Sequence, residues 1–290
     1  MSGTINHLDI WGGLSSPIAE HVNRISQQCL NAYRANPLLV REHANIERGT
    51  AEGGYGRRQL YELVQNGADQ LLGSSGRIEV LLDQNALYCA NEGTPVDRSG
   101  VESLLCSHLS SKRGWEIGRF GLGFKSVLGI TDCPEFYSRS GSFVFNRGMT
   151  QERISRIATS ERYPILRVAY PGSAIEAMSN DRTLKDLMSW ASTVVKMPLL
   201  SGAGTWLSDD LASFPAEFVL FAGHVSRLTL ENRVTGKRRE IRCERAEEIV
   251  VLQEGEKTAA WKVFSTKYRP SEEARKEAGQ LADREELPLH

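Results

Sequence analysis

Cysteine is scarce in the sequence, and it never occurs in a closely spaced pair. Five cysteines stand far apart in the chain, at Cys29, Cys89, Cys106, Cys133 and Cys243. No C-x-x-C pair occurs, and the six histidines form no H-E-x-x-H motif. The spacing therefore argues against a disulfide-rich secreted scaffold and against the common zinc motifs. It predicts reduced thiols in a cytoplasmic protein.

Neither an excess of charge nor a long apolar run is present. The formal net charge is −1 over 290 residues, so the chain as a whole has no electrostatic attraction to nucleic acid or to a membrane surface. The longest apolar runs are short, as at 249–252, and cannot span a bilayer. The N-terminus reads MSGTINHLDIW, with no basic region before an apolar core, so no secretion signal is predicted. We expect a globular cytoplasmic protein without membrane or direct nucleic-acid contact.

Hydrophobic periodicity and turn residues predict a chain that mixes helices with strands. Helices are expected at 17–36, 38–48, 60–72, 99–109, 151–159, 181–190 and 208–223. Strands are expected at 77–82, 86–90, 135–138, 142–145, 165–170, 193–199, 227–232, 239–243, 248–252 and 260–266.

The stretch YELVQNGADQ carries a polar stripe on one side of a predicted helix. Glu62, Asn66 and Asp69 follow the spacing i, i+4, i+7, which places them on one face, opposite an apolar face. The wet side of an ordinary amphipathic helix would show the same pattern. The stripe alone therefore leaves a functional and a structural interpretation open.

A glycine-rich turn, GRFGLGFKS, precedes another predicted helix. Gly118, Gly121 and Gly123 permit close backbone approach, so that amide N–H groups can converge on an anion, and Lys125 adds a positive charge. A turn that simply needs glycines would look similar. The spacing does not match G-x-x-x-x-G-K-[ST], and the glycines do not open a first βα unit as in a Rossmann fold.

Three motifs follow one another within about 65 residues, and together they resemble a known family. They read YGRRQLYELVQNGAD, LYCANEGTP and IGRFGLGFKSVLGITDCPEFYS, with LSSKR between the last two. In this order the chain resembles the GHKL ATPases, which include the ninety-kilodalton heat-shock chaperones, gyrase B, MutL-type and MORC proteins and the histidine kinases. It looks most like the sacsin N-terminal ATP-binding-like domains. The resemblance covers about 55–145, and a weaker likeness extends to about 225.

The resemblance implies a fold and a domain division. The expected fold is a two-layer α/β (α+β) sandwich with a mixed, mostly antiparallel sheet and helices on one face, followed by extra β-strands. The ATP-binding domain would span 1–225, additional strands 226–270, and a charged tail 271–290. The implied activity is Mg²⁺-dependent ATP binding with slow hydrolysis, used as a conformational switch in a chaperone-like or assembly-controlling protein.

Roles within the helix also follow from the resemblance. Glu62 matches the residue that orients or deprotonates water against the γ-phosphate, and Asn66 matches the Mg²⁺ ligand. Asp69 fits the motif either as an ATP contact or as a structural hydrogen-bonding group. Histidine kinases lack the water-activating Glu, so Glu62 favours hydrolysis over phosphotransfer to a protein.

The adenine end departs from the family pattern, which is usually D-x-G-x-G. Here Asn91 stands in place of the Asp, followed by Gly93 and then by Pro95 in place of the second Gly. An Asn carbonyl can still accept a hydrogen bond from the adenine amino group, although the charge is lost. Thr193 resembles the strand Thr that contacts adenine directly or through water, and it also fits an ordinary strand position.

Phosphate contacts are expected from the glycine turn, through the backbone of Gly118, Arg119, Phe120, Gly121, Leu122, Gly123 and Phe124. Lys125 is expected either to touch phosphate or to act only on the local field. Lys112 resembles a residue of the lid, which is predicted at 96–117.

Several partners and alternatives stay open. GHKL ATPases usually take a Lys or Arg for the γ-phosphate from a following domain, often in a homodimer, and a protein client is conceivable. The module could instead sense nucleotide or act as a scaffold without hydrolysis. It could also be the ATPase part of a larger DNA-processing or defence protein.

Overall fold

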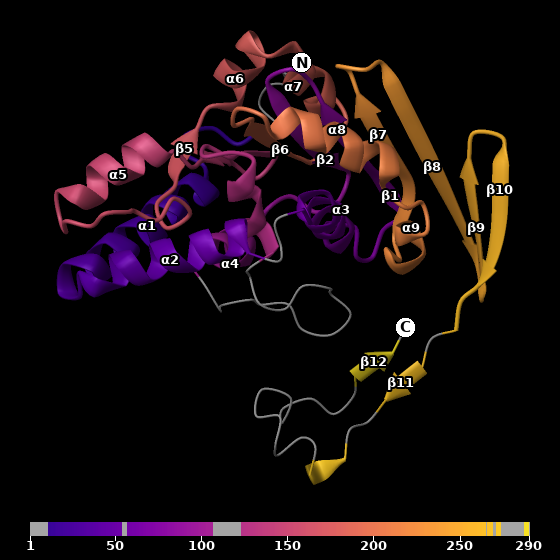
Figure 1. Ribbon diagram of the computed structural model, residues 1–290, viewed down its shortest axis with the longest axis horizontal. Coiled ribbons are helices and arrows are strands. Elements are labelled where there is room, and N and C mark those ends of the chain that lie inside the picture. The colour runs from indigo at the N-terminus through magenta and orange to yellow at the C-terminus, as the bar shows by residue number, and fades with distance from the viewer. Residues whose placement is uncertain are drawn as a thin grey trace, which may run out of the picture.

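A computed structural model describes residues 11–53, 57–106, 123–264, 266–268, 271–273 and 287–289 (Figure 1). The predicted tail, 271–290, therefore lies mostly outside the described residues. Among the described helices, none has the length and apolar character needed to cross a membrane.

Ten strands form one open sheet in the order β10-β9-β8-β7-β1-β2-β6-β3-β4-β5. Their bounds are β1 Gly76–Leu82, β2 Ala86–Asn91, β3 Glu135–Ser138, β4 Ser142–Val144, β5 Tyr170–Gly172, β6 Thr193–Pro198, β7 Val225–Asn232, β8 Lys237–Ala246, β9 Ile249–Glu254 and β10 Lys257–Lys262. Within this described sheet β1 and β7 pair in parallel, and the other neighbours are antiparallel. The backbones of β11 (Thr266–Tyr268) and β12 (Leu287–Leu289) form a separate two-stranded sheet.

The helices described are α1 Pro17–Ala35, α2 Leu38–Glu52, α3 Gln59–Gln70, α4 Arg98–Leu105, α5 Arg147–Ser155, α6 Ala174–Asn180, α7 Arg182–Met188, α8 Ala203–Ser213 and α9 Phe218–Phe221, with the 3-10 helix η2 at Gly123–Gly129. The mixed α+β class with a mostly antiparallel sheet is thus confirmed. Most predicted helices are present with shifted ends. Where a helix was expected after the glycine turn, the described chain has the tighter η2.

Strand β2 is buried on both faces, and the helices on its second face correct the expectation of helices on one face. Along β2, Leu87 and Cys89 belong to the large core that includes α1 and α3. Tyr88 and Ala90, which point the other way, pack instead in a second cluster with Leu184 of α7. Every side chain of β2 is therefore shielded. The second face is covered by α6 and α7.

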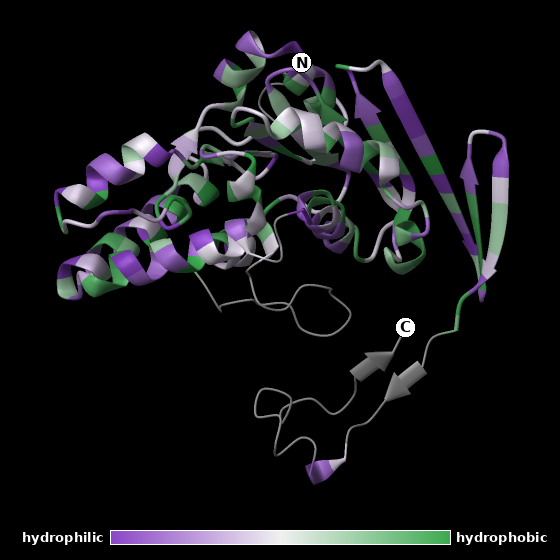
Figure 2. Ribbon diagram, in the orientation of Figure 1, coloured by the Kyte–Doolittle hydropathy of each residue, from purple (hydrophilic) through white to green (hydrophobic). Residues whose placement is uncertain are grey.

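The predicted boundary at 225/226 falls at the start of a strand in the middle of the sheet. β7 begins at Val225 and lies beside β1, which it meets in parallel. β8, β9 and β10 then continue the sheet outward (Figure 1). Figure 2 shows β8 mostly in the hydrophilic colour, as expected for a strand near the sheet edge with alternating exposed positions. The predicted additional strands therefore share one sheet with the strands before them.

The predicted strand at 165–170 is wrong, because helix side chains take up its backbone groups. Glu47 of α2 accepts hydrogen bonds from the backbone N–H groups of Ile165 and Leu166, at 2.6 and 3.0 Å. Ser26 of α1 donates to the carbonyl of Ala169 and accepts from its N–H, both at 3.0 Å. With these groups bonded to side chains, strand pairing begins only at β5.

The helix predicted over 208–223 is divided into α8 and α9. α8 ends at Ser213, and Pro215 follows after one more residue. Proline removes a backbone donor and disfavours helical geometry in the residue before it, so the helix ends ahead of it.

Glu47 provides a test of this interior. Glu47→Ala leaves the N–H groups of Ile165 and Leu166 without their acceptor in a buried setting. We expect the free energy of unfolding in urea to fall by about 3 kcal/mol. The matched control is Glu42→Ala on the exposed side of the same helix, expected to change it by less than about 0.5 kcal/mol. Equal losses in the two variants would contradict the anchoring role of Glu47.

Candidate functional site

Helix α3 presents the polar stripe as the sequence predicts. Glu62, Asn66 and Asp69 lie on its half-buried side, and Leu63 and Val64 are buried on the other. The helix packs closely on the sheet, because a Cβ atom at Gly67 would stand 3.0 Å from the Cδ1 atom of Ile78 on β1. This packing holds α3 over the strands. The side chains of Glu62, Asn66 and Asp69 lie along the half-buried side of the helix.

The end of the glycine turn lies against the first residue of the stripe. A Cβ atom built on Gly123 would stand 1.8 Å from Oε2 of Glu62, so this carboxylate lies directly against the glycine and would have to turn aside for a larger residue. The structure thus brings together Glu62 and Gly123, two predicted site residues 61 positions apart. Five other predicted residues of the turn, and the predicted lid lysine, lie outside the described residues: Gly118, Arg119, Phe120, Gly121, Leu122 and Lys112.

Three neighbouring strands carry a row of polar side chains, where β2 and β3 end and β6 begins. Asn91 of β2 stands opposite Thr193 of β6, which stands opposite Ser138 of β3. Their alternate neighbours Cys89 and Phe136 belong to the core beneath α3, so the row faces that helix. The register thus places Asn91 and Thr193 side by side on the α3 face. Ser138 is a member that the sequence did not single out, and only its pairing with Thr193 identifies it.

Hydrogen bonds connect this row to the segment after β2. The hydroxyls of Ser138 and Thr193 lie 3.0 Å apart, and Ser138 accepts a bond of 2.9 Å from the backbone N–H of Val96. Oδ1 of Asn91, a residue only 4 % exposed, accepts a bond of 3.1 Å from the N–H of Gly93. One lone pair of this amide oxygen therefore holds the local turn, and the second is the one that a ligand could use.

Gly93 rests on the C-terminal end of α3. A Cβ atom there would stand 2.3 Å from the backbone oxygen of Gln70, and the N–H of Thr94 donates to that same oxygen at 2.8 Å. Glu92 points the other way and pairs with Arg77 at 3.1 Å. α3 therefore contacts two of the predicted glycines, Gly123 near one end and Gly93 at the other.

Residues after Gly123 turn into the interior. Phe124 packs on Phe136, with ring centroids 5.1 Å apart. Lys125 is only 1 % exposed, and its pKa is lowered to about 8, first by burial and then by Arg167, while Glu47 opposes the shift. The charge on Lys125 thus belongs to a buried group of ionisable residues, and a phosphate contact by this side chain stays a prediction.

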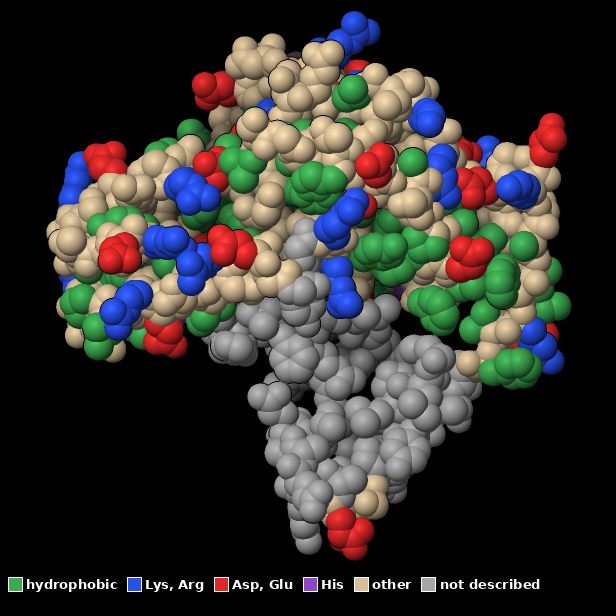
Figure 3. All heavy atoms as spheres, viewed as in Figure 1, with side chains coloured by type: hydrophobic (Ala, Val, Ile, Leu, Met, Phe, Trp, Pro, Cys, Tyr) green, Lys and Arg blue, Asp and Glu red, His purple; other side chains and the backbone are tan. Residues whose placement is uncertain are grey.

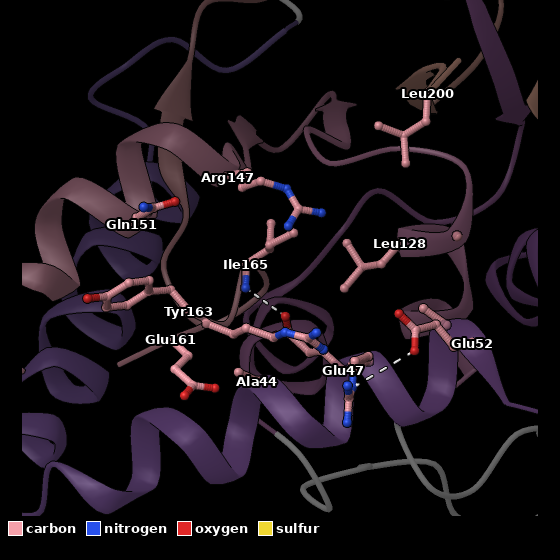
Figure 4. Close-up of a pocket in the computed structure, with 14 residues that line it drawn as sticks. Ala44, Glu47, Glu52, Leu128, Arg147, Gln151, Glu161, Tyr163, Ile165 and Leu200 are labelled. Atoms are coloured by element: carbon pink, nitrogen blue, oxygen red, sulfur yellow. Dashed lines mark hydrogen bonds and ion pairs between the residues drawn. The ribbon is translucent and has the colours of Figure 1, made fainter. Parts of the chain in front are cut away.

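A cavity of about 500 Å³ lies elsewhere, between α2, α5 and the end of η2 (Figure 4). It is bounded by charged side chains of both signs, among them Arg147, Glu161 and Glu52. Its lining includes none of the predicted site residues that the structure describes. On the face in Figure 3, basic and acidic side chains are likewise interspersed rather than gathered by sign.

Comparisons with known proteins add no assignment. A scan of the chain against protein-family models finds no match, and a search of curated protein sequences finds none either.

The contact between Gly123 and Glu62 can be tested with a double-mutant cycle. Gly123→Ala makes the carboxylate of Glu62 turn to another rotamer, so we expect a loss of about 1 kcal/mol in the free energy of unfolding. In a Glu62→Ala background the same change should cost less than about 0.5 kcal/mol, because the clashing atoms are gone. The control is Gly223→Ala, where nothing lies within 4 Å of the added atom. Additive losses from Gly123→Ala and Glu62→Ala would show that the two residues do not touch.

Proposed function

We propose that this chain is an ATP-binding module of the GHKL type that depends on Mg²⁺ and hydrolyses ATP slowly, using the cycle as a conformational switch. The observation that carries the proposal is the contact between Glu62 and Gly123. A water-activating carboxylate has to lie beside the loop that cradles the terminal phosphates. Glu62 and Gly123 lie far apart in the sequence and close together in the fold, and this supports the proposal.

Glu62 and Asn66 divide the chemistry between them. Successive turns of one helix hold both side chains about 6 Å apart along its axis, so their relative position is fixed. The amide oxygen of Asn66 suits Mg²⁺, which takes oxygen ligands and keeps several waters, and phosphate oxygens would complete its shell. The bound ion would neutralise developing charge on the phosphates. Glu62 would orient the attacking water and accept its proton.

The strand-end row supports recognition of the base. Asn91 and Thr193 offer an amide oxygen and a hydroxyl side by side on the α3 face of the sheet. An amide oxygen can accept from the adenine amino group, and the hydroxyl can donate or accept directly or through a water. Asp69, near the same end of α3 as Gly93, would either join this contact or hold the row in place.

A second candidate is a nucleotide sensor or scaffold that binds ATP without turnover. The specific observation in its favour is the bond from the Gly93 N–H to Asn91, which engages a neutral side chain where the family has a charged one. A neutral acceptor weakens a hydrogen bond by about 1 kcal/mol. A Lys or Arg for the γ-phosphate from a partner subunit or another domain, a protein client, and a place in a DNA-processing or defence assembly remain parts of the proposal to be tested.

Glu62→Gln separates binding from hydrolysis. The variant keeps the shape of the side chain and removes the base, so we expect ATP affinity within about threefold of wild type and phosphate release reduced by about 100-fold or more. Calorimetry with and without Mg²⁺ measures the first quantity and a phosphate-release assay the second. Glu42→Gln, an exposed change on α2, is the matched control and should leave both unchanged.

The outcomes distinguish the two candidates. Tight Mg²⁺-dependent binding without wild-type hydrolysis would favour the sensor. No ATP binding by the wild-type chain would overturn both and would return the α3 stripe to a structural role.

A further inference from the structure

Two cavities of about 500 Å³ each adjoin one another along α2. The first is the cavity of Figure 4, which reaches α5 and the end of η2. The second continues it toward Pro37, just before the start of α2. Four residues line both cavities, which together form one trench: Ala44, Arg48, Glu161 and Arg162. We call it the α2 trench. Each of its two parts has the volume of a site that can hold a small molecule.

The wall of the trench opposite α2 is held in place by hydrogen bonds. Glu47 of α2 accepts the backbone N–H groups of Ile165 and Leu166. The backbone N–H of Ser160 donates to the hydroxyl of Tyr163 at 3.2 Å. The trench is therefore formed before any ligand arrives, so a ligand would pay little for ordering its walls.

Arginines outnumber carboxylates around the trench. The arginines are Arg41, Arg48, Arg147 and Arg162, and the carboxylates are Glu47, Glu52 and Glu161. Burial raises the pKa of Glu47, so this carboxylate adds the least negative charge. Arg48 approaches Glu52 only at 3.9 Å, between two exposed side chains. The trench as a whole therefore favours an anion.

Three of the four guanidinium groups have donors to spare. Within the described part of the chain, Arg41 and Arg162 make no ion pair or hydrogen bond with the protein, and they line the trench from opposite walls. Arg147 donates from Nε to Asp132 at 3.2 Å, and Figure 4 shows the tip of its side chain directed into the cavity. An anion in the trench can therefore receive hydrogen bonds from several sides.

The spacing of these arginines selects the kind of anion. A guanidinium group matches the oxygens of a phosphate with two parallel hydrogen bonds. Arg41 and Arg48 lie two turns apart on α2, about 10 Å along the helix axis, which is more than one phosphate can span. Ala51, Leu128 and Leu200 give the first cavity an apolar lining that can hold carbon atoms.

We propose that the α2 trench binds a soluble small molecule that carries at least two phosphate groups on a compact carbon skeleton. Its phosphates would lie between Arg41, Arg48 and Arg162 at one end and beside Arg147 at the other. The lining of the trench includes none of the predicted ATP-site residues that the structure describes, so this site is separate from the one on α3.

Calorimetry with myo-inositol hexakisphosphate as the probe tests the proposal on the whole chain, at about 0.1 M salt so that diffuse attraction is partly screened. The double variant Arg41→Gln/Arg162→Gln should bind the probe at least about tenfold more weakly, because two guanidinium–phosphate contacts are lost. The matched control, Arg156→Gln/Arg182→Gln, removes the same charge at exposed positions outside the trench and should stay within about twofold of wild type. Urea unfolding checks that both double variants are folded.

Further outcomes separate this site from other sources of binding. Glu62→Gln should bind the probe as wild type does, since Glu62 is not part of the trench. Equal weakening in the two double variants would overturn the proposal, because it would mean attraction to overall charge. Orthophosphate binding as tightly as the probe, or no binding of the probe at about 1 mM, would also overturn it. So would capture of the chain by vesicles that carry phosphatidylinositol bisphosphate when the free probe does not bind.

Discussion

Close packing of α3 against the sheet is the constraint on which the candidate site depends. Gly67 lets the helix approach β1 until its backbone meets Ile78, and Gly93 lets the segment after β2 rest on the C-terminal end of the same helix. A side chain at Gly93 would collide with the backbone of Gln70, and one at Gly67 would press on the side chain of Ile78, since protein interiors are packed without spare volume. With α3 fixed, the carboxylate of Glu62 meets Gly123, and the strand-end row lies under the same helix.

Buried polar and charged side chains hold together α2, η2 and the segment before β5. Glu47, Lys125 and Arg167 are each at least 97 % buried, and they connect α2, η2 and the segment before β5. Burying such groups is costly unless they are hydrogen-bonded and matched in charge. Glu47 meets this requirement through two backbone N–H groups, and in doing so it keeps residues 165–169 out of the sheet.

The extended sheet changes how the chain is divided. A sequence interpretation separates the strands after 225 from the domain before them, since the family resemblance ends there. In the structure β7, which follows that boundary, pairs in parallel with β1, which precedes it. β8 lies on the other side of β7, and β2 lies on the other side of β1. Parallel pairing needs a long connection, and here it spans everything from β2 to α9. The first strand of the sheet can therefore take its final neighbour only after most of the chain has been made.

The sequence by itself determined the class of fold, the α3 stripe and the core face of that helix. Such features depend on local periodicity, which residues near in sequence carry alone. It also indicated Glu62, Asn66, Asn91, Gly93, Gly123 and Thr193 as a set. Only the tertiary structure decided which of them touch, because contacts such as Glu62 with Gly123 and Thr193 with Ser138 join distant segments. It likewise decided that 165–169 is no strand, since Glu47 and Ser26 compete for backbone bonds that local propensity cannot foresee.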